Sequence, residues 1–313
     1  MGIFILRRLL LTLPVMAVVA LFVFSLLYVA PGDPATMIAG DQATPAEVER
    51  IRVSLGLDQP FAIRFGAWAF AALRGDLGNS LFSGQSVVSM IAQRIPPTLS
   101  LMILTLLISV SVAVPLGVVA AARQGSWVDR AVSSFAVLGF SLPVFVLGYV
   151  LAYVFALELG WFPVQGYAPS SDGFGPFIHH LILPALALSG GYIALITRIT
   201  RSAMLEVLSQ DYVRTAKAKG VARRSVLFVH ALKNAALPII SIVGIGVATL
   251  ISGAVVTETV FGIPGLGRLI VDALLRRDYP IIQGVVLVFS LAYIVVNLGV
   301  DVLYTFLDPR IRY

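Results

Sequence analysis

The sequence contains no cysteine and only three histidines. The absence of cysteine excludes a disulfide framework, a cysteine-ligated zinc or iron–sulfur centre and a thiol nucleophile. The histidines, His179, His180 and His230, are too few and too scattered for a histidine-based metal site. The sequence also lacks the Gly-x-x-x-x-Gly-Lys-Ser/Thr pattern of a phosphate-binding loop, and no pair of carboxylates is placed as acid and base. We therefore predict a non-catalytic chain that holds no metal or cofactor of its own.

Charged residues are also scarce. They make up 12% of the 313 residues, whereas 58% are hydrophobic; soluble domains carry about 25% charged residues. This small amount of polar surface cannot cover a water-soluble globule. We therefore expect a lipid bilayer around most of the chain. The net charge of +6 does not indicate nucleic acid, because the basic residues cluster in short loops between apolar runs.

Six apolar stretches have the length of a membrane span. A helix needs about 20 apolar residues to cross a hydrocarbon core of about 30 Å. None of the six contains Lys or Arg, and they cover approximately residues 9–30, 98–121, 131–157, 178–197, 237–257 and 281–307. A seventh stretch, 60–73, is shorter and contains Arg64, so we expect a short interfacial or buried helix there. The fold class predicted is an all-α integral membrane protein with six transmembrane helices.

The first stretch has an alternative interpretation. Arg7 and Arg8 followed by an apolar run are typical of a secretory signal peptide. The run of 22 residues exceeds the usual apolar region of about 7–15 residues, and no small-x-small cleavage site ends it. We expect it to be retained as the first helix.

Three prolines, Pro115, Pro143 and Pro184, lie within the apolar stretches. Each removes a backbone hydrogen bond and can kink its helix. The kinks would suit a protein that opens and closes. The alternative is that proline is simply commoner in membrane helices than in soluble ones.

The distribution of Lys and Arg predicts the orientation. If residues 1–8 are cytoplasmic, the segments on that side hold fourteen of the 22 basic residues and the short opposite loops hold three. Both termini, 1–8 and 308–313, are therefore expected in the cytoplasm, with loop 31–97 outside. In that loop Thr44, Pro45 and Glu47 follow the pattern of a helix start, so we expect the loop to be structured.

The inner loop, residues 198–236, is the most basic part of the chain. Ala216 and Ala218 alternate there with cationic residues, and Gly220 suits a left-handed helix end. A second helical stretch, 223–234, follows, so the unit reads as helix, glycine turn, helix. A short helix with small residues docks closely in a cleft, and its cations pair with acidic groups of a partner. The alternative is a basic loop that only lies on anionic lipid.

This stretch resembles the cytoplasmic loop of importer-type ABC permeases, whose consensus is Glu-Ala-Ala, three residues, then Gly. Arg214, Thr215 and Ala216 occupy the Glu-Ala-Ala positions, so only Ala216 and Gly220 match the general pattern. The order Tyr-Val-Arg-Thr-Ala-Lys-Ala-Lys-Gly, with His-Ala-Leu-Lys-Asn-Ala at 230–235, instead resembles the variant of dipeptide and oligopeptide permeases.

Further resemblances to these permeases are spread along nearly the whole chain and occur in the right order. They are Arg-Arg-Leu at 7–9, Pro-Gly-Asp-Pro at 31–34, Leu-Gly-Leu-Asp-Gln-Pro at 55–60, Gly-Asp-Leu-Gly-Asn-Ser at 75–80, Glu-Thr-Val-Phe-Gly-Ile-Pro-Gly-Leu-Gly at 258–267 and Leu-Asp-Pro-Arg-Ile-Arg at 307–312. Together with the topology, these motifs are specific for this family of permeases, whereas one motif alone would be weak evidence.

The resemblance implies the importer-type ABC permease fold in a bacterial cytoplasmic (inner) membrane, with a permease core at 98–307. The chain would form half of the translocation pore of an ATP-driven importer of di- or oligopeptides. Its partners would be a second homologous permease, two ATP-binding subunits that hold ATP and Mg, and an extracytoplasmic substrate-binding protein. Glutathione, nickel chelates and oligosaccharides are alternative substrates. The implied ATPase-coupling residues are Arg214, Thr215, Ala216, Lys217, Ala218, Lys219 and Gly220.

Several polar residues are candidates for the gate or pore. Glu258, at the outer end of the fifth span, is either a gate contact or an interfacial residue satisfied by Thr257 or Thr259. Asn297 and Asp301 share one helix face and could line the pore. The alternative for Asp301 is an ion pair with a basic residue of the inner loop. Ser141 and Tyr149 are candidates for the translocation path.

Two other classes of protein fit the sequence less well than the importer does. An ion-coupled transporter ordinarily has ionisable residues deep in its spans, and these spans have almost none at their centres. An intramembrane enzyme needs a nucleophile or metal motif within a span, and the sequence shows neither.

Overall fold

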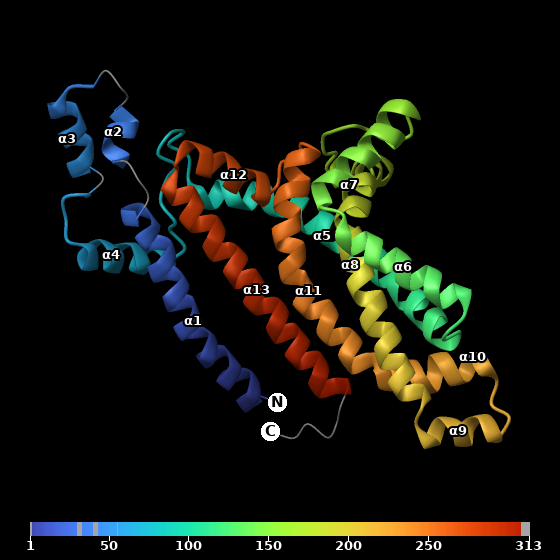
Figure 1. The fold of residues 1–313 in the computed structure, drawn as a ribbon. Coiled ribbons are helices and arrows are strands. Elements are labelled where there is room, and N and C mark those ends of the chain that lie inside the picture. The colour runs from blue at the N-terminus through green and yellow to red at the C-terminus, as the bar shows by residue number, and fades with distance from the viewer. Residues whose placement is uncertain (1, 30–32, 40–42, 55, 308–313) are drawn as a thin grey trace. The chain divides into compact units, whose positions relative to one another are not determined.

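The computed structural model describes residues 2–29, 33–39, 43–54 and 56–307, and these are almost entirely helical (Figure 1). Within these ranges the only strand-like pairing is the isolated bridge between Asn79 and Ser86. The terminal motif at 307–312 and the segment 308–313 lie outside the described residues, apart from the backbone of Leu307. The chain divides into two compact units: Met1–Pro96 with Arg268–Val295, and Pro97–Gly267 with Val296–Tyr313.

Among the residues that the structure describes, five helices are long and apolar enough to cross a membrane, and a bent pair brings the number to as many as six. This confirms the all-α membrane fold. At 1.5 Å per residue, the longest of these helices extend about 50 Å, well beyond a hydrocarbon core of about 30 Å. The five spans are Leu10–Tyr28, Val87–Ala122, Phe174–Leu208, Arg223–Val260 and Tyr279–Leu303.

The third expected span is broken, so a continuous helix over 131–157 is wrong. Helix α6 (Trp127–Ser141) ends before Pro143, and α7 (Val144–Leu151) continues as the π-helix Ala152–Glu158 in a direction that differs by 101°. Leu142 is extended, with ψ 123°, because a proline disfavours the helical conformation of the residue before it. By contrast, Pro115 and Pro184 lie inside continuous helices, α5 and α8.

The N-terminal unit begins with α1 (Gly2–Val29), α2 (Pro34–Ala39), α3 (Pro45–Ser54) and α4 (Phe61–Leu73). The helix start at Thr44 is confirmed: the Glu47 carboxylate accepts hydrogen bonds from the backbone N and Oγ1 of Thr44, both at 2.8 Å. These bonds lower the pKa of Glu47. Helix α5 (Val87–Ala122) starts within the region expected to be loop, so 87–97 is helical.

In the second unit, α8 (Phe174–Leu208) is the most buried span, with 67% of its most apolar window inside the structure. Helices α6, α7 and α11 (Leu232–Val260) pack against it. Gly246 of α11 faces the Tyr192 ring so closely that a side chain there would overlap the ring, and the Tyr192 hydroxyl donates to the Val243 carbonyl. Small residues at such contacts let membrane helices approach closely. The chain also forms a 3-10 turn (Ser170–Asp172), α12 (Leu266–Arg276) and α13 (Tyr279–Leu307).

Candidate functional site

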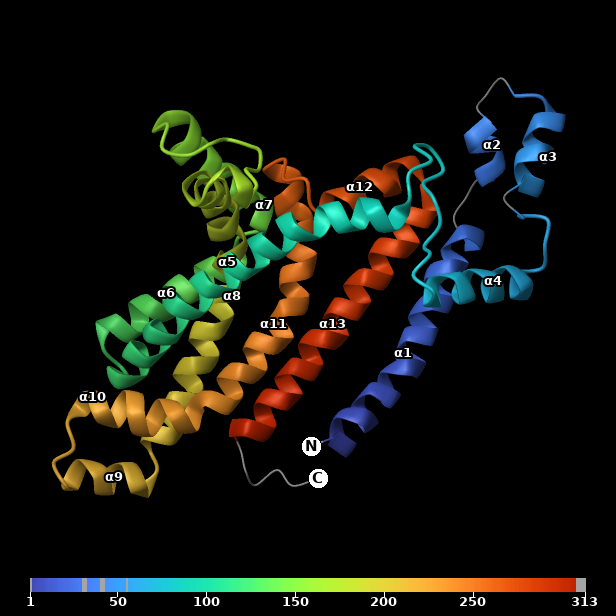
Figure 2. The same ribbon diagram turned by 180° about the vertical axis from the view of Figure 1, so that it is seen from behind.

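The expected coupling residues lie on a short separate helix, α9 (Asp211–Ala218), and, for Lys219 and Gly220, at its end, between α8 and α10 (Figure 2). Val213 is fully buried, and α9 packs through this side against the end of α8 and the π-helical segment Val226–Ala231. Arg214, Thr215, Lys217, Ala218 and Lys219 are exposed, and Ala216 is half-buried. One face is therefore anchored, and the other presents small and cationic side chains.

The end of α9 depends on Gly220, which has φ 75°, as expected from the sequence. The backbone N of Gly220 donates to the Lys217 carbonyl at 3.0 Å, and that of Val221 donates to the Ala216 carbonyl at 3.2 Å. This pair of bonds is the Schellman arrangement, in which a left-handed residue satisfies the last carbonyls of a helix. Gly220 thus fixes where α9 stops and where the chain turns back.

Both ends of α9 continue within a few residues into long helices. It follows α8, of 35 residues, and precedes a 38-residue span in which α10 (Arg223–Ser225), the π-helical segment and α11 run together. The second stretch, expected to be a helix at 223–234, is therefore the beginning of that long helix. Short connections therefore tie α9 to both long helices.

An ion pair that was not predicted from the sequence, between buried Asp129 and half-buried Arg201, holds the turn before α6 against α8. Asp129, only 5% exposed, accepts hydrogen bonds from Nε and Nη2 of Arg201 at 2.5 and 2.8 Å, and from the backbone N of Gly125 at 2.9 Å. Ser126 caps the start of α6. The order Ser-x-x-Asp at 126–129 is a helix-start pattern that could have indicated Asp129.

A basic cavity of about 810 Å³ lies beside α9. Arg123, Lys217 and Arg223 line it, and Nη2 of Arg223 donates to the Ala122 carbonyl at 2.7 Å, which ties the start of α10 to the end of α5. Among the described residues that line the cavity there is no carboxylate, so its charged side chains are all basic.

Glu258 lies near the opposite end of the same 38-residue span, about 50 Å from Arg223 when measured along the helix at 1.5 Å per residue. Its side chain is completely buried and accepts a hydrogen bond from Oγ1 of Thr98 at 2.6 Å. Thr98 Oγ1 in turn accepts from the backbone N of Leu266 at 2.8 Å. The expectation that Thr257 or Thr259 satisfies Glu258 is wrong, because their hydroxyls donate to the carbonyls of Gly253 and Val255.

Two glycines make room for this carboxylate. An added side chain at Gly265 would overlap the Glu258 carboxyl group, and one at Gly267 would overlap the Val255 backbone and lie 2.9 Å from Glu258 Oε2. The segment after α11 thus folds back over Glu258, and we name Thr98, Glu258, Gly265, Leu266 and Gly267 the outer anchor. Sequence reasoning found Glu258 but neither Thr98 nor the reason for the glycines.

The remaining pore candidates lie on separate elements, and their roles stay predictions. Ser141 is the last residue of α6, is exposed and donates to the Val137 carbonyl at 2.9 Å. Tyr149 lies on α7 and is also exposed. Asn297 and Asp301 lie one turn apart on α13 and are half-buried.

Comparison with known families defines the class of protein. Residues 113–313 match the binding-protein-dependent transport system inner membrane component family, and residues 1–102 match the N-terminal part of such membrane components. The chain belongs to this family, and is therefore a multi-pass inner-membrane permease component without catalytic activity. In ABC systems of this kind, separate subunits use the ATP.

Relatives align along the whole chain. A probable peptide ABC transporter permease of Sinorhizobium fredii is 54% identical over 100% of both chains. A putative peptide transport system permease of Brucella abortus is 46% identical over 99% of this chain and 98% of its own. The glutathione transport system permease protein GsiC of Escherichia coli is 42% identical over 99% of both.

The fold has a counterpart among solved structures. A chain of the MetNI methionine ABC transporter in an inward facing conformation superposes with a TM-score of 0.59 over 70% of this chain and 96% of its own, at 15% identity. This likeness supports the fold alone.

Proposed function

We propose that the chain is the membrane-spanning permease of an ATP-driven importer of di- or oligopeptides and forms half of the translocation pore with a second homologous permease. The observation that carries the proposal is α9, a helix anchored at Val213, closed by Gly220 and tied at both ends to long membrane helices. Its exposed face, with the adjacent basic cavity, would dock on an ATP-binding subunit in the cytoplasm.

The geometry suits the transmission of force. When the ATP-binding subunits close, the docked α9 would move, and α8 and the 223–260 helix would move with it. The far end of that helix holds Glu258 in the outer anchor, so motion at the cytoplasmic side would reach the outer segment 261–267. With α9 in the cytoplasm, residues 1–8, 198–236 and 308–313 would lie on the cytoplasmic side. The region 31–97 would lie outside and face the substrate-binding protein.

The proposed substrate class rests on the relatives. Two relatives, at 54% and 46% identity, are named as peptide transport permeases, and a third, at 42%, is named as a glutathione transport permease. Glutathione is itself a small peptide, so it is the second candidate. Membership of the binding-protein-dependent family argues against an ion-coupled transporter.

The test is uptake by the complete transporter reconstituted in liposomes with its binding protein. We expect accumulation of a labelled dipeptide or oligopeptide that requires ATP and persists after an ionophore collapses the ion gradients. An excess of unlabelled peptide should compete, and glutathione should compete less. Uptake that stops with the ion gradient would contradict the transport class, and uptake of glutathione with no peptide uptake would contradict the substrate class.

A further inference from the structure

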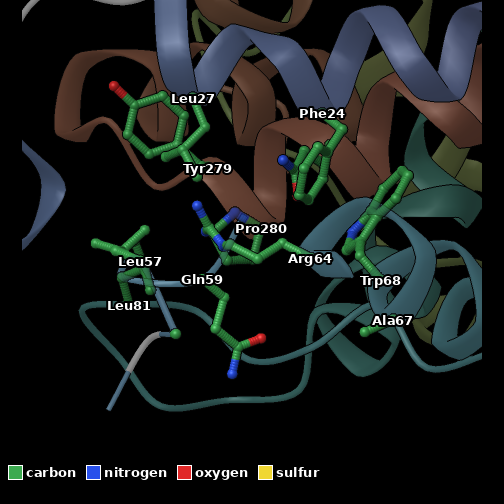
Figure 3. Close-up of a pocket in the computed structure, with 12 residues that line it drawn as sticks. Phe24, Leu27, Leu57, Gln59, Arg64, Ala67, Trp68, Leu81, Tyr279 and Pro280 are labelled. Atoms are coloured by element: carbon green, nitrogen blue, oxygen red, sulfur yellow. The ribbon is translucent and has the colours of Figure 1, made fainter. Parts of the chain in front are cut away.

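A pocket of about 300 Å³ lies in the unit formed by Met1–Pro96 and Arg268–Val295 (Figure 3). It is bounded by α1, α4, the turn at 56–59 and the start of α13, and its walls are mostly apolar. Phe24 and Trp68 lie side by side there, with ring centroids 5.3 Å apart (Figure 3). The polar side chains in its lining include Arg64, Gln59 and Gln283.

Arg64 brings an uncompensated positive charge to this pocket. Its Nη1 donates to the Tyr28 hydroxyl at 2.5 Å, and its guanidinium carbon lies 5.3 Å from the Tyr28 ring centroid and 5.8 Å from that of Phe24. Within the part of the chain that the structure describes, no carboxylate pairs with Arg64. A guanidinium has five N–H donors, so most of its donors remain available for an anion.

The helix that carries Arg64 has the features of an interfacial helix. Helix α4 has 13 residues, none of them buried, so at about 20 Å it is too short to cross the bilayer. Its apolar side chains Ile63, Phe70 and Leu73 are 59%, 56% and 87% exposed. An apolar helix exposed in this way is stable in the plane of the membrane interface, where Trp and Tyr rings also lie at headgroup level. Arg64 would then be at the depth of lipid phosphates.

We propose that this pocket binds the headgroup of an anionic phospholipid. The Arg64 guanidinium would contact the phosphate, with the Gln59 and Gln283 amides close by, and an acyl chain would lie along the apolar wall. Arg64 would attract the phosphate of either lipid class. An anionic lipid is favoured because no acid in the lining would hold the ammonium group of a zwitterionic lipid. The apolar wall disfavours a free inorganic anion.

The test is native mass spectrometry of the intact transporter complex, titrated with phosphatidylglycerol or with phosphatidylcholine. The parent complex is expected to retain phosphatidylglycerol preferentially. In Arg64→Gln the tightest phosphatidylglycerol site should weaken about tenfold or more, the effect of losing a charge-assisted hydrogen bond. The matched control is Arg74→Gln, because Arg74 follows the same helix but lies outside the pocket, with its guanidinium carbon 4.0 Å from the Phe70 ring centroid.

A second variant leaves Arg64 in place. Ala67 is exposed and lines the pocket, so Ala67→Asp would supply a competing carboxylate without filling a packed core. It should also remove the preference for phosphatidylglycerol. Equal retention of both lipids by the parent, unchanged binding in both pocket variants, or displacement of phosphatidylglycerol by inorganic phosphate would overturn the proposal. A photo-reactive residue at position 67 that cross-links to the second permease chain and not to lipid would also overturn it.

Discussion

Gly220→Val is expected to abolish uptake while the chain still inserts in the membrane. Gly220 has φ 75°, and this left-handed conformation costs a residue with a side chain about 1–2 kcal/mol, with more for a β-branched residue. A Cβ added at Gly220 would have no heavy atom within 4 Å, so the expected cost is strain in the backbone. The last turn of α9 would loosen, and uptake should fall by more than about tenfold.

Two controls separate this effect from general damage. Gly220→Asn should retain much of the uptake, because asparagine tolerates the left-handed conformation. Gly160→Val carries the same backbone strain, since Gly160 has φ 65° and open space around it, but it lies far along the chain from α9. Uptake by Gly220→Val at the parent's rate, with equal amounts of protein in the membrane, would rule out a coupling role for α9.

Gly267→Ala is expected to destabilise the outer anchor. The added methyl group would overlap the backbone of Val255 and lie 2.9 Å from the Glu258 carboxylate. Flexible side chains can move aside, but the backbone of a packed helix cannot, so the cost should reach the upper end of the range for overpacking, about 3 kcal/mol. Thermal denaturation of the purified complex should show a clear drop in stability, and uptake should fall with it.

Gly299→Ala is the matched control for this change. Gly299 also lies in a long apolar helix, α13, and an added methyl group there has no neighbour within 4 Å. Its stability should equal or slightly exceed that of the parent, because alanine is favoured over glycine inside a helix. If Gly267→Ala is as stable as Gly299→Ala, the segment 261–267 does not pack over Glu258 as described.

The parts of the fold that depend on local chemistry could be predicted from the sequence. Length and hydrophobicity locate the spans, Thr44 and Glu47 start a helix, and Gly220 ends one. Each of these signals involves residues within a few positions of one another. The break at Pro143 was harder to predict, because Pro115 and Pro184 are also prolines within apolar stretches and yet lie in continuous helices.

The parts that depend on distant pairs could not be predicted in the same way. Thr98 and Glu258 are 160 residues apart, and Asp129 and Arg201 are 72 residues apart. The sequence around each of these residues does not indicate which distant residue it contacts. A single buried carboxylate such as Glu258 indicates that some partner exists, but only the packing of α5 against α11 and the following turn identifies it. In the proposed transporter, the pore-lining residues would depend further on a second permease chain.

The most direct measurement uses the absence of cysteine from the chain. A single Ala218→Cys substitution would place a thiol on the exposed face of α9, free of background. We expect it to cross-link to an ATP-binding subunit of the intact transporter and to react with a membrane-impermeant thiol reagent only from the cytoplasmic side. Labelling from the outer side, or a complex whose ATP-binding subunits never cross-link to this position, would contradict α9 as the coupling element.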